Sequence, residues 1–272
     1  MKTNIKNFYK PKSLSELFKI LNNNSALLAG GTFLSQHASN KITSLVDLSN
    51  LNLNFIKKIN NSMFIGATTT FAQIAESKYF STLSEITGNT ATEPLRNMIT
   101  VGGNVMIPLS WSDLPLIFLV LKADFILKSP RKRIISADSF FKKSPKSILK
   151  KGELLTEIII PNISKIKLAR KKVIRAHDDF PALQLAVSLS LSRKKIDFIR
   201  IAFVANKPLP SRLKKAEKIL INKIPDDNLI EQAGSIAESE VPHLNDIRFS
   251  NDYLKEMIRV YTCRLIHQCI EQ

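Results

Sequence analysis

Two glycine pairs constrain the fold of this chain more than any other feature. Gly30-Gly31 and Gly102-Gly103 supply four of the eight glycines in 272 residues, and each pair follows an apolar run. We expect a strand to end in a sharp turn at each point, because glycine permits positive φ and lets a ligand approach the backbone N–H groups. Thr32, Thr100 and Asn104 add polar flanks. A single pair is typical of an ordinary turn, but two such turns favour a long anionic ligand held at two points.

The composition limits the class of protein. With 44% hydrophobic residues, the chain can bury the core of one large or two to three small domains. No window reaches the roughly 18 apolar residues of a membrane span, and the N-terminus has no apolar signal-peptide core. Cys263 and Cys269 lie on different faces of a predicted helix, which suits neither a disulfide nor a metal or iron–sulfur cluster. These features predict a cytoplasmic protein.

The net charge of +17 raises the question of a nucleic-acid partner. The lysines and arginines gather in residues 128–151, 165–172 and 193–195. These runs lack interleaved aromatic residues, and no helix-turn-helix, zinc-finger or RNP-like pattern accompanies them, so we expect no nucleic-acid partner. Solvated faces are the ordinary explanation of such runs. The alternative for some of them is a surface that meets an acidic partner subunit or an anionic cofactor.

The first 161 residues predict two lobes of mixed helix and strand. Apolar residues at helical spacing predict a helix over 12–22, with Ser13 as N-cap and Glu16 completing a capping box. Strands at 26–29 and 43–48 complete the first lobe, which is predicted to be β-α-β. The second lobe is predicted to contain strands at 62–67, 124–128 and 157–160 and helices at 70–76, 81–89 and 113–121.

The pattern changes after Pro161. Residues 162–172 are basic and are predicted to be a linker or the edge of a new domain. Residues 182–193 and 196–205 alternate as two antiparallel strands joined at Lys194-Lys195. Helices are predicted at 213–220, 229–238 and 251–268. A small sheet covered by helices, a separate α+β domain, is therefore expected.

A succession of motifs carries a family resemblance. In order, these are FYxPxSLxE from Phe8, LAGGT from Leu28, IGAxTT from Ile65, LRNMITVGGN from Leu95, SDLP from Ser112 and ELLTEIIIP from Glu153. A looser match continues as PxPxRxxxAExxL from Pro208. The succession resembles the FAD-binding subunits of the molybdenum hydroxylases, the family of the medium subunits of xanthine dehydrogenase and carbon monoxide dehydrogenase.

This resemblance implies an α+β fold with a two-lobed FAD-binding domain of the vanillyl-alcohol-oxidase (PCMH) type at residues 1–161. Its lobes would span about 1–57 and 58–161. Residues 162–272 would form a C-terminal domain like that of the carbon monoxide dehydrogenase flavoprotein, an α+β domain with a small antiparallel sheet. The implied cofactor-binding residues are Leu27, Leu28, Ala29, Gly30, Gly31, Thr32, Phe33, Leu34, Thr100, Val101, Gly102, Gly103, Asn104, Asp113, Leu155 and Lys172.

Each part of this set has an implied role. The two glycine segments would hold the FAD pyrophosphate from two sides. Asp113 would accept hydrogen bonds from ribose or ribityl hydroxyls, and Leu155 would make an apolar contact. Lys172 would complement the phosphates or the reduced flavin, and the alternative is one more surface lysine.

The resemblance also implies a function. The chain would bind FAD non-covalently and pass electrons from [2Fe–2S] clusters of a small partner subunit to NAD⁺ or another acceptor. The molybdenum cofactor would lie in a large partner subunit, where the substrate is hydroxylated, so no residue here would be catalytic. Two alternatives stay open. One is a stand-alone FAD-dependent reductase, although its catalytic serine and glutamate motif is not found. The other is a basic binding or scaffold protein that has lost its flavin.

Several residues depart from the family pattern. Phe33 stands where relatives have an acidic or small polar residue, and it could pack on the cofactor or enter the core. Phe203-Val204-Ala205-Asn206 replaces a glycine pair, which predicts a reshaped surface loop. No metal site is expected. The four histidines, His37, His177, His243 and His267, have no ligand spacing, and the adjacent residues His177-Asp178-Asp179 cannot converge on one ion.

Overall fold

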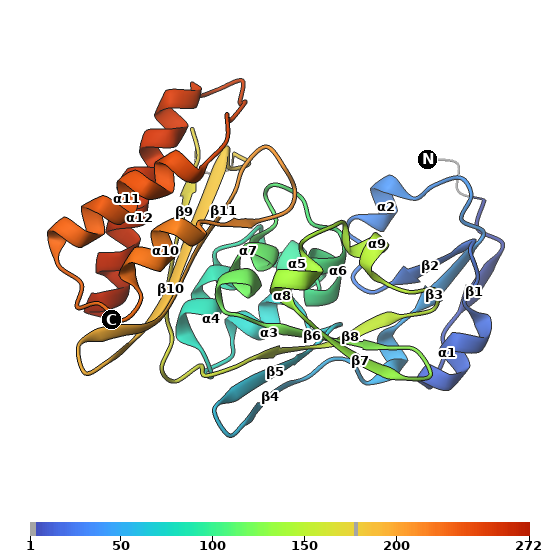
Figure 1. Ribbon diagram of the computed structural model, residues 1–272. Helices are drawn as coiled ribbons and strands as arrows, with labels where there is room; N and C mark the ends of the chain where they lie inside the picture. Colours follow the sequence, from blue (N-terminus) through green and yellow to red (C-terminus); the bar gives the residue numbers. More distant parts are fainter. Residues whose placement is uncertain (1–3, 177–178) are drawn as a thin grey trace. The chain divides into compact units, whose positions relative to one another are not determined.

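The structure, a computed structural model, describes residues 4–176 and 179–272 (Figure 1). The chain forms two compact units. The first contains residues 4–107 and 124–161, and the second contains residues 108–123 together with 162–176 and 179–272. Residues 108–123 therefore leave the first unit, join the second, and return the chain to the first.

The first unit contains two sheets. The small lobe has a parallel sheet in the order β1-β3-β2, and the larger lobe has an antiparallel sheet in the order β4-β5-β8-β6-β7. The strands are β1 (Asn7–Tyr9), β2 (Ser25–Leu28), β3 (Ser44–Asp47), β4 (Ile56–Ile59), β5 (Ser62–Gly66), β6 (Asp124–Lys128), β7 (Lys132–Ser136) and β8 (Leu154–Ile160). The helices are α1 (Leu14–Ile20), α2 (Leu34–His37), the 3₁₀ turn η1 (Ser49–Leu51), α3 (Phe71–Ala75), α4 (Ser81–Gly88), α5 (Glu93–Arg96), α6 (Val101–Met106), α8 (Ala137–Phe140) and α9 (Pro145–Ile148).

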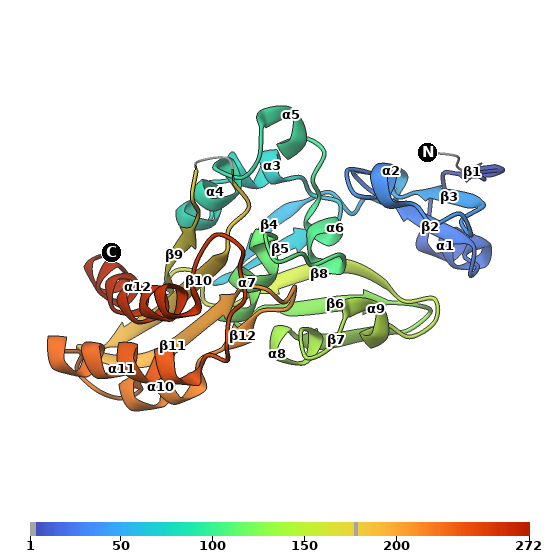
Figure 2. The same cartoon turned by 90° about the horizontal axis from the view of Figure 1, so that it is seen from above.

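Helix α1 packs on the small sheet, as Figures 1 and 2 show. Its Leu17 is fully buried with Val46 of β3. Ser13 caps the helix by accepting a hydrogen bond from the Glu16 N–H at 3.1 Å, which confirms the predicted N-cap. The Glu16 carboxylate accepts from the N–H of Lys12 at 2.7 Å rather than from Ser13, so the predicted reciprocal capping box was wrong. The carboxylate reaches one residue further back, to another free donor at the helix start.

An ion pair between the half-buried Arg133 and the buried Glu153 ties β7 to the turn before β8. Arg133 donates through Nε and Nη2 to the two carboxylate oxygens of Glu153, at 2.8 and 2.5 Å. Glu153 also accepts from the N–H of Lys150 at 2.7 Å. The hydrogen bonds from Arg133 hold the pKa of the Glu153 carboxyl below its usual value, against the opposing effect of burial. The pair fixes the entry into β8, the strand between β5 and β6.

Replacing Glu153 with glutamine should destabilise the protein by about 2 kcal/mol at pH 7, because a charge-assisted fork is lost. The folded-state pKa is lowered, so the carboxylate's contribution is fully present above the ordinary pKa of 4.5 and is lost as the pH falls through the lowered value. Urea unfolding at pH 7 and pH 3 measures this effect. The difference between wild type and Glu153→Gln should shrink at pH 3. The control is Glu85→Gln, at an exposed position on α4, and equal losses in both variants would contradict the assignment.

The second unit is a four-stranded antiparallel sheet in the order β12-β11-β10-β9, with helices on it. Its strands are β9 (Lys167–Val173), β10 (Leu183–Ser192), β11 (Lys195–Val204) and β12 (Ser211–Arg212). Its helices are α7 (Asp113–Val120), α10 (Lys214–Leu220), α11 (Asp227–Glu240) and α12 (Asn251–Glu271). None of the described helices of the chain is long and apolar enough to cross a bilayer.

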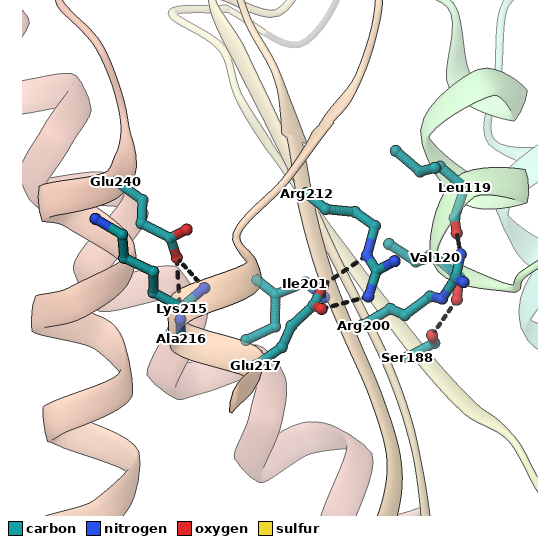
Figure 3. A network of polar contacts seen from close by, with 10 residues as sticks. All are labelled: Leu119, Val120, Ser188, Arg200, Ile201, Arg212, Lys215, Ala216, Glu217 and Glu240. Carbon is teal, nitrogen blue, oxygen red and sulfur yellow. Dashed lines mark hydrogen bonds and ion pairs between the residues drawn. The ribbon is translucent and has the colours of Figure 1, made fainter. Parts of the chain in front are cut away.

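Both faces of this sheet are covered. Alternate residues of β10, such as Leu185 and Val187, join the apolar core beneath α10, α11 and α12 (Figure 1). The intervening positions meet α7, which is buried on every side. The Ser188 hydroxyl donates to the Val120 carbonyl at 2.6 Å, and Arg200 Nη1 donates to the Leu119 carbonyl at 2.7 Å (Figure 3). These polar side chains satisfy carbonyls at the C-terminal end of α7.

One prediction for this unit was wrong and one alternative is decided. Of the two alternatives for residues 162–172, a linker or the edge of a new domain, the structure agrees with the second, since Lys167–Val173 form the edge strand β9 of this unit. The basic residues of β9 suit an edge because charge opposes pairing with other chains. The predicted surface loop at 203–206 begins inside β11, where Phe203 and Val204 are buried. The predicted hairpin is confirmed, with its turn one residue earlier, at Arg193-Lys194. Both turn residues have positive φ, of 50° and 65°, the conformation of a two-residue hairpin turn.

Candidate functional site

The first glycine segment forms the turn that its sequence predicts. Strand β2 ends at Leu28, Gly31 has φ of +73°, and α2 begins at Leu34. Five consecutive backbone N–H groups, from Ala29 to Phe33, donate to no acceptor within the described parts of the chain. These residues are only half-exposed. Half-buried donors without an acceptor in the protein fit the oxygens of an anion, which would satisfy them together.

The second glycine segment differs from its prediction. It forms the start of α6 instead of a strand end, and Gly102 and Gly103 both lack positive φ. Their N–H groups are engaged within the protein: Gly102 donates to the Ala67 carbonyl at 2.7 Å, and Gly103 donates to the Thr100 hydroxyl at 3.2 Å. The predicted positive-φ turn was therefore wrong. Gly102 is required for a different reason, since a Cβ there would lie 2.7 Å from the Ala67 carbonyl oxygen.

The two segments meet within the first unit. A Cβ on Gly30 would lie 1.5 Å from the carbonyl oxygen of Met98 and 2.6 Å from its carbonyl carbon. The turn after β2 therefore packs backbone against backbone on the residues that lead into α6. The bridge between Thr70 and Thr100 anchors these residues in turn to the start of α3. The donors of the first segment are thus held beside the residues that lead into the second segment.

Side chains near this junction give the site an apolar component. Phe33 stacks on His37 with ring centroids 4.2 Å apart, so it does not enter the core. Leu27 is 37% exposed. Leu95 and Met98, 44% and 48% exposed, are further candidates that the sequence did not single out. Both residues lie in the LRNMITVGGN motif, and that position could have marked them as site candidates. Apolar side chains beside backbone donors are typical of cofactor sites.

Leu155 lies in β8 opposite Leu127 of β6, and it is 3% exposed. The structure therefore places it in the packed sheet of the first unit, where its side chain contributes to the core. Its predicted contact with a cofactor stays a prediction.

Asp113 and Lys172 belong to the second unit, where the structure brings them together. Asp113, 1% exposed, lies at the start of α7 and forms ion pairs with Arg170 and, at 2.8 Å, with Lys172 of β9. Burial lowers the pKa of the Lys172 ammonium, and the Asp113 carboxylate partly opposes that effect. Lys172 is thus half-buried and ion-paired rather than freely solvated, and its predicted contact with FAD stays a prediction. Arg170 was missed because it falls inside the predicted linker.

Gln184 of β10 fixes the residues that precede Asp113. It is fully buried, and its Nε2 donates to the carbonyls of Ser110 and Ser112 at 3.0 and 3.4 Å. Its Oε1 has no hydrogen-bond partner among the described residues. This side chain therefore orders the turn into α7 and, with it, the position of the Asp113 backbone.

No group of three or more histidine, cysteine, aspartate or glutamate residues that could hold a metal occurs in residues 4–176 and 179–272. His177 and Asp178 of the His177-Asp178-Asp179 run lie outside the described residues. His37 stacks on Phe33, and His267 Nε2 lies 3.8 Å from the exposed Asp227. These two described histidines have local structural contacts.

A turn of backbone donors without an acceptor among the described residues, beside apolar side chains on a two-lobed α+β unit, is typical of proteins that bind a nucleotide cofactor. Comparison with known families is more specific. Residues 3–163 match the family described as the FAD binding domain in molybdopterin dehydrogenase, and residues 169–269 match the CO dehydrogenase flavoprotein C-terminal domain. The chain belongs to the family of FAD-binding subunits of the molybdenum hydroxylases.

Individual relatives align with this chain over nearly its whole length. The glyceraldehyde dehydrogenase medium chain of Sulfolobus acidocaldarius is 30% identical over 268 residues, covering 94% of this chain and 95% of that protein. The carbon monoxide dehydrogenase medium chain of Hydrogenophaga pseudoflava is 25% identical and covers 92% of each. The solved carbon monoxide dehydrogenase from Hydrogenophaga pseudoflava that lacks the Mo-pyranopterin moiety has the same fold. Its TM-score is 0.88 at 24% identity, with coverage of 100% of this chain and 99% of that one.

These comparisons confirm four predictions from the sequence: the family, the α+β fold class with its two kinds of domain, FAD as the cofactor of the N-terminal domain, and an oxidoreductase subunit as the class of enzyme. In this family the molybdenum cofactor and the iron–sulfur clusters belong to other subunits.

Proposed function

We propose that this chain is the electron-transfer subunit of a molybdenum hydroxylase, taking electrons from [2Fe–2S] clusters of a small partner subunit and passing them through FAD to NAD⁺ or another acceptor. The observation that carries the proposal is the turn at 29–33. It offers five backbone donors that have no acceptor among the described residues, and it packs on the segment leading to α6. This arrangement suits a pyrophosphate.

The proposed FAD-binding residues divide by chemistry. Backbone donors come from the turn within Leu27–Leu34. The second segment, Thr100–Asn104, contributes close backbone approach, since its Gly103 is exposed and has no side chain to exclude a ligand. The resemblance adds Asp113, Leu155 and Lys172 as contacts.

The chain's own contribution is placement and electrostatics, since bound FAD supplies the redox chemistry that couples one-electron donors to a two-electron acceptor. The 29–33 turn would hold the phosphates in a fixed position, and the exposed Leu27 and half-buried Phe33 would exclude water beside it once the cofactor is bound. No proton transfer at a side chain of this chain is required.

The partners follow from the same proposal. A large subunit would carry the molybdenum cofactor and hydroxylate the substrate, and a small subunit would carry the [2Fe–2S] clusters. The complex would reside in the cytoplasm, where reducing conditions keep thiols such as the buried Cys263 and Cys269 free.

The visible absorption spectrum of the purified protein tests the cofactor. We expect the bands of an oxidised flavin, with the chromophore released into the supernatant by acid precipitation and identified as FAD. NADH should then reduce a dye slowly through the protein, and no substrate should be hydroxylated by this chain alone. A colourless protein that cannot be reconstituted with FAD would contradict the proposal and favour a basic scaffold. Hydroxylation or reduction of a substrate by the isolated chain would favour a stand-alone reductase.

A further inference from the structure

A basic hollow lies in the second unit between β11, β12 and α10, and its lining includes none of the residues proposed to bind FAD. It has a volume of about 430 Å³ and is open to solvent. Its lining includes five cationic side chains: Lys122, Arg200, Arg212, Lys214 and Lys218. Lys122, Lys214 and Lys218 are exposed and have no ion-pair partner in the part of the chain that the structure describes.

Among the described residues, the two carboxylates that line the hollow, Asp197 and Glu217, are both engaged. Glu217 accepts a fork of hydrogen bonds from Arg212 and another from the N–H of Ile201 at 3.0 Å (Figure 3). Asp197 accepts from the Ser190 hydroxyl at 2.6 Å. The positive charge of Lys122, Lys214 and Lys218 therefore has no ion-pair partner among the described residues.

The walls of the hollow are fixed before any partner binds. Arg200 is 6% exposed, and its guanidinium donates to the Leu119 carbonyl (Figure 3). Glu240 of α11 accepts from the backbone N–H groups of Lys215 and Ala216, both at 2.9 Å, which holds the first turn of α10. Preorganised walls reduce the entropy that a partner loses on binding.

The lining also has an apolar component, which separates a protein partner from a simple counter-ion. Phe198 and Ile221 are half-buried, and Ile199 is 5% exposed beside them. A lining that combines buried or half-buried apolar side chains with exposed cations matches the ordinary composition of protein interfaces. Nucleic acid would instead favour exposed aromatic rings interleaved with the cations, and Phe198 is the one aromatic side chain in this described lining.

We propose that this hollow docks an acidic segment of a partner subunit, with carboxylates against Lys122, Lys214 and Lys218 and an apolar side chain over Phe198. The proposal rests on the proposed function, because it requires that the chain assemble with other subunits. It assigns part of the excess charge of +17 to a defined surface.

Charge reversal of the three free lysines tests the proposal. The variant Lys122→Glu/Lys214→Glu/Lys218→Glu keeps the Arg212–Glu217 network intact. The control is Lys142→Glu/Lys143→Glu/Lys146→Glu, three exposed lysines of the first unit with the same change in charge. FAD content is measured first. Titration with the molybdenum and iron–sulfur subunits purified from the same cells then gives the affinity of each protein at low and high salt.

Both variants should retain FAD as the wild type does. The hollow variant should lose at least about tenfold in affinity for the partner subunits, and its remaining affinity should depend less on salt than that of the wild type. The control should stay within about twofold. Equal affinities of the two variants for the partner subunits would overturn the proposed docking at the hollow but would not contradict the proposed function. Absence of both FAD and partner binding in the wild type would overturn the proposed function and this inference with it.

Discussion

Replacing Gly30 with alanine is expected to remove bound FAD and to destabilise the first unit. The new Cβ would fall 1.5 Å from the Met98 carbonyl oxygen, a backbone atom that cannot swing aside. The turn would have to separate from the segment leading to α6. We expect a loss of about 3 kcal/mol in unfolding free energy, at the upper end for overpacking by one carbon. FAD affinity should fall at least about tenfold, because the backbone donors at 29–33 would be displaced.

Chemical denaturation and flavin absorbance measure the two effects separately. Gly88→Ala is the matched control, since a Cβ on Gly88 at the end of α4 would meet only the Cβ of Ala75 at an ordinary 3.5 Å. Alanine there should be neutral or slightly stabilising. If Gly30→Ala retained both stability and FAD at the level of Gly88→Ala, the backbone contact between the two segments would be refuted.

Replacing Asp113 with asparagine should have a comparable effect on stability, for an electrostatic reason. The change keeps the shape of the side chain but leaves Arg170 and Lys172 without their shared anion at a site where Asp113 is 1% exposed. Breaking a buried ion pair from one side costs about 3–5 kcal/mol, and we expect about 3 kcal/mol because Lys172 retains some solvent contact. Loss of the carboxylate should also lower the pKa of Lys172 further, since the attraction that opposes burial is removed.

The pH dependence has a definite sign. The folded-state pKa of Lys172 lies below its unfolded value, so the unfolded chain binds more protons between the two values and stability rises with pH in that interval. In Asp113→Asn this rise should begin at a lower pH. Urea unfolding from pH 7 to pH 10 measures it. The control is Asp227→Asn, at an almost fully exposed position. If stability depended on pH in the same way in both variants, the proposed coupling of Asp113 to Arg170 and Lys172 would be contradicted. FAD content of folded Asp113→Asn tests the proposed cofactor contact independently.

Periodicity and capping signals predicted many elements of the fold closely. Strand β6 was predicted at its observed bounds, and α3, α4 and α7 within one residue at each end. The elements that escaped are short or basic. Strand β9 carries Lys167, Arg170, Lys171 and Lys172, and a charged edge strand has the composition of a linker. Strand β7 is also a charged edge, with alternation too short to separate from a turn.

The site shows a different limit. The first glycine segment was predicted correctly, because a strand followed by Gly-Gly-Thr has few alternatives. The second failed, because the reason for glycine at 102 is the carbonyl of Ala67, thirty-five residues away in sequence. Close backbone approach and positive φ both require glycine, so the sequence alone does not distinguish the two. The ion partner of Asp113 at Arg170 was equally invisible, since only the folded sheet brings α7 to β9.

The excursion of residues 108–123 into the second unit has a consequence for dissecting this protein. Helix α7 supplies the cover for one face of the β9–β12 sheet, and Ser188, Arg200 and Gln184 are anchored on its carbonyls or on those just before it. A fragment beginning at residue 162 would present that face to water, with three buried polar anchors released and an apolar sheet surface prone to self-association. The two family matches end at residue 163 and begin at residue 169, which places the domain boundary between these residues. The compact second unit, however, also includes residues 108–123, which come earlier in the chain. The segment that matches the C-terminal family domain is therefore shorter than the set of residues that must be present for this unit to pack and stay stable.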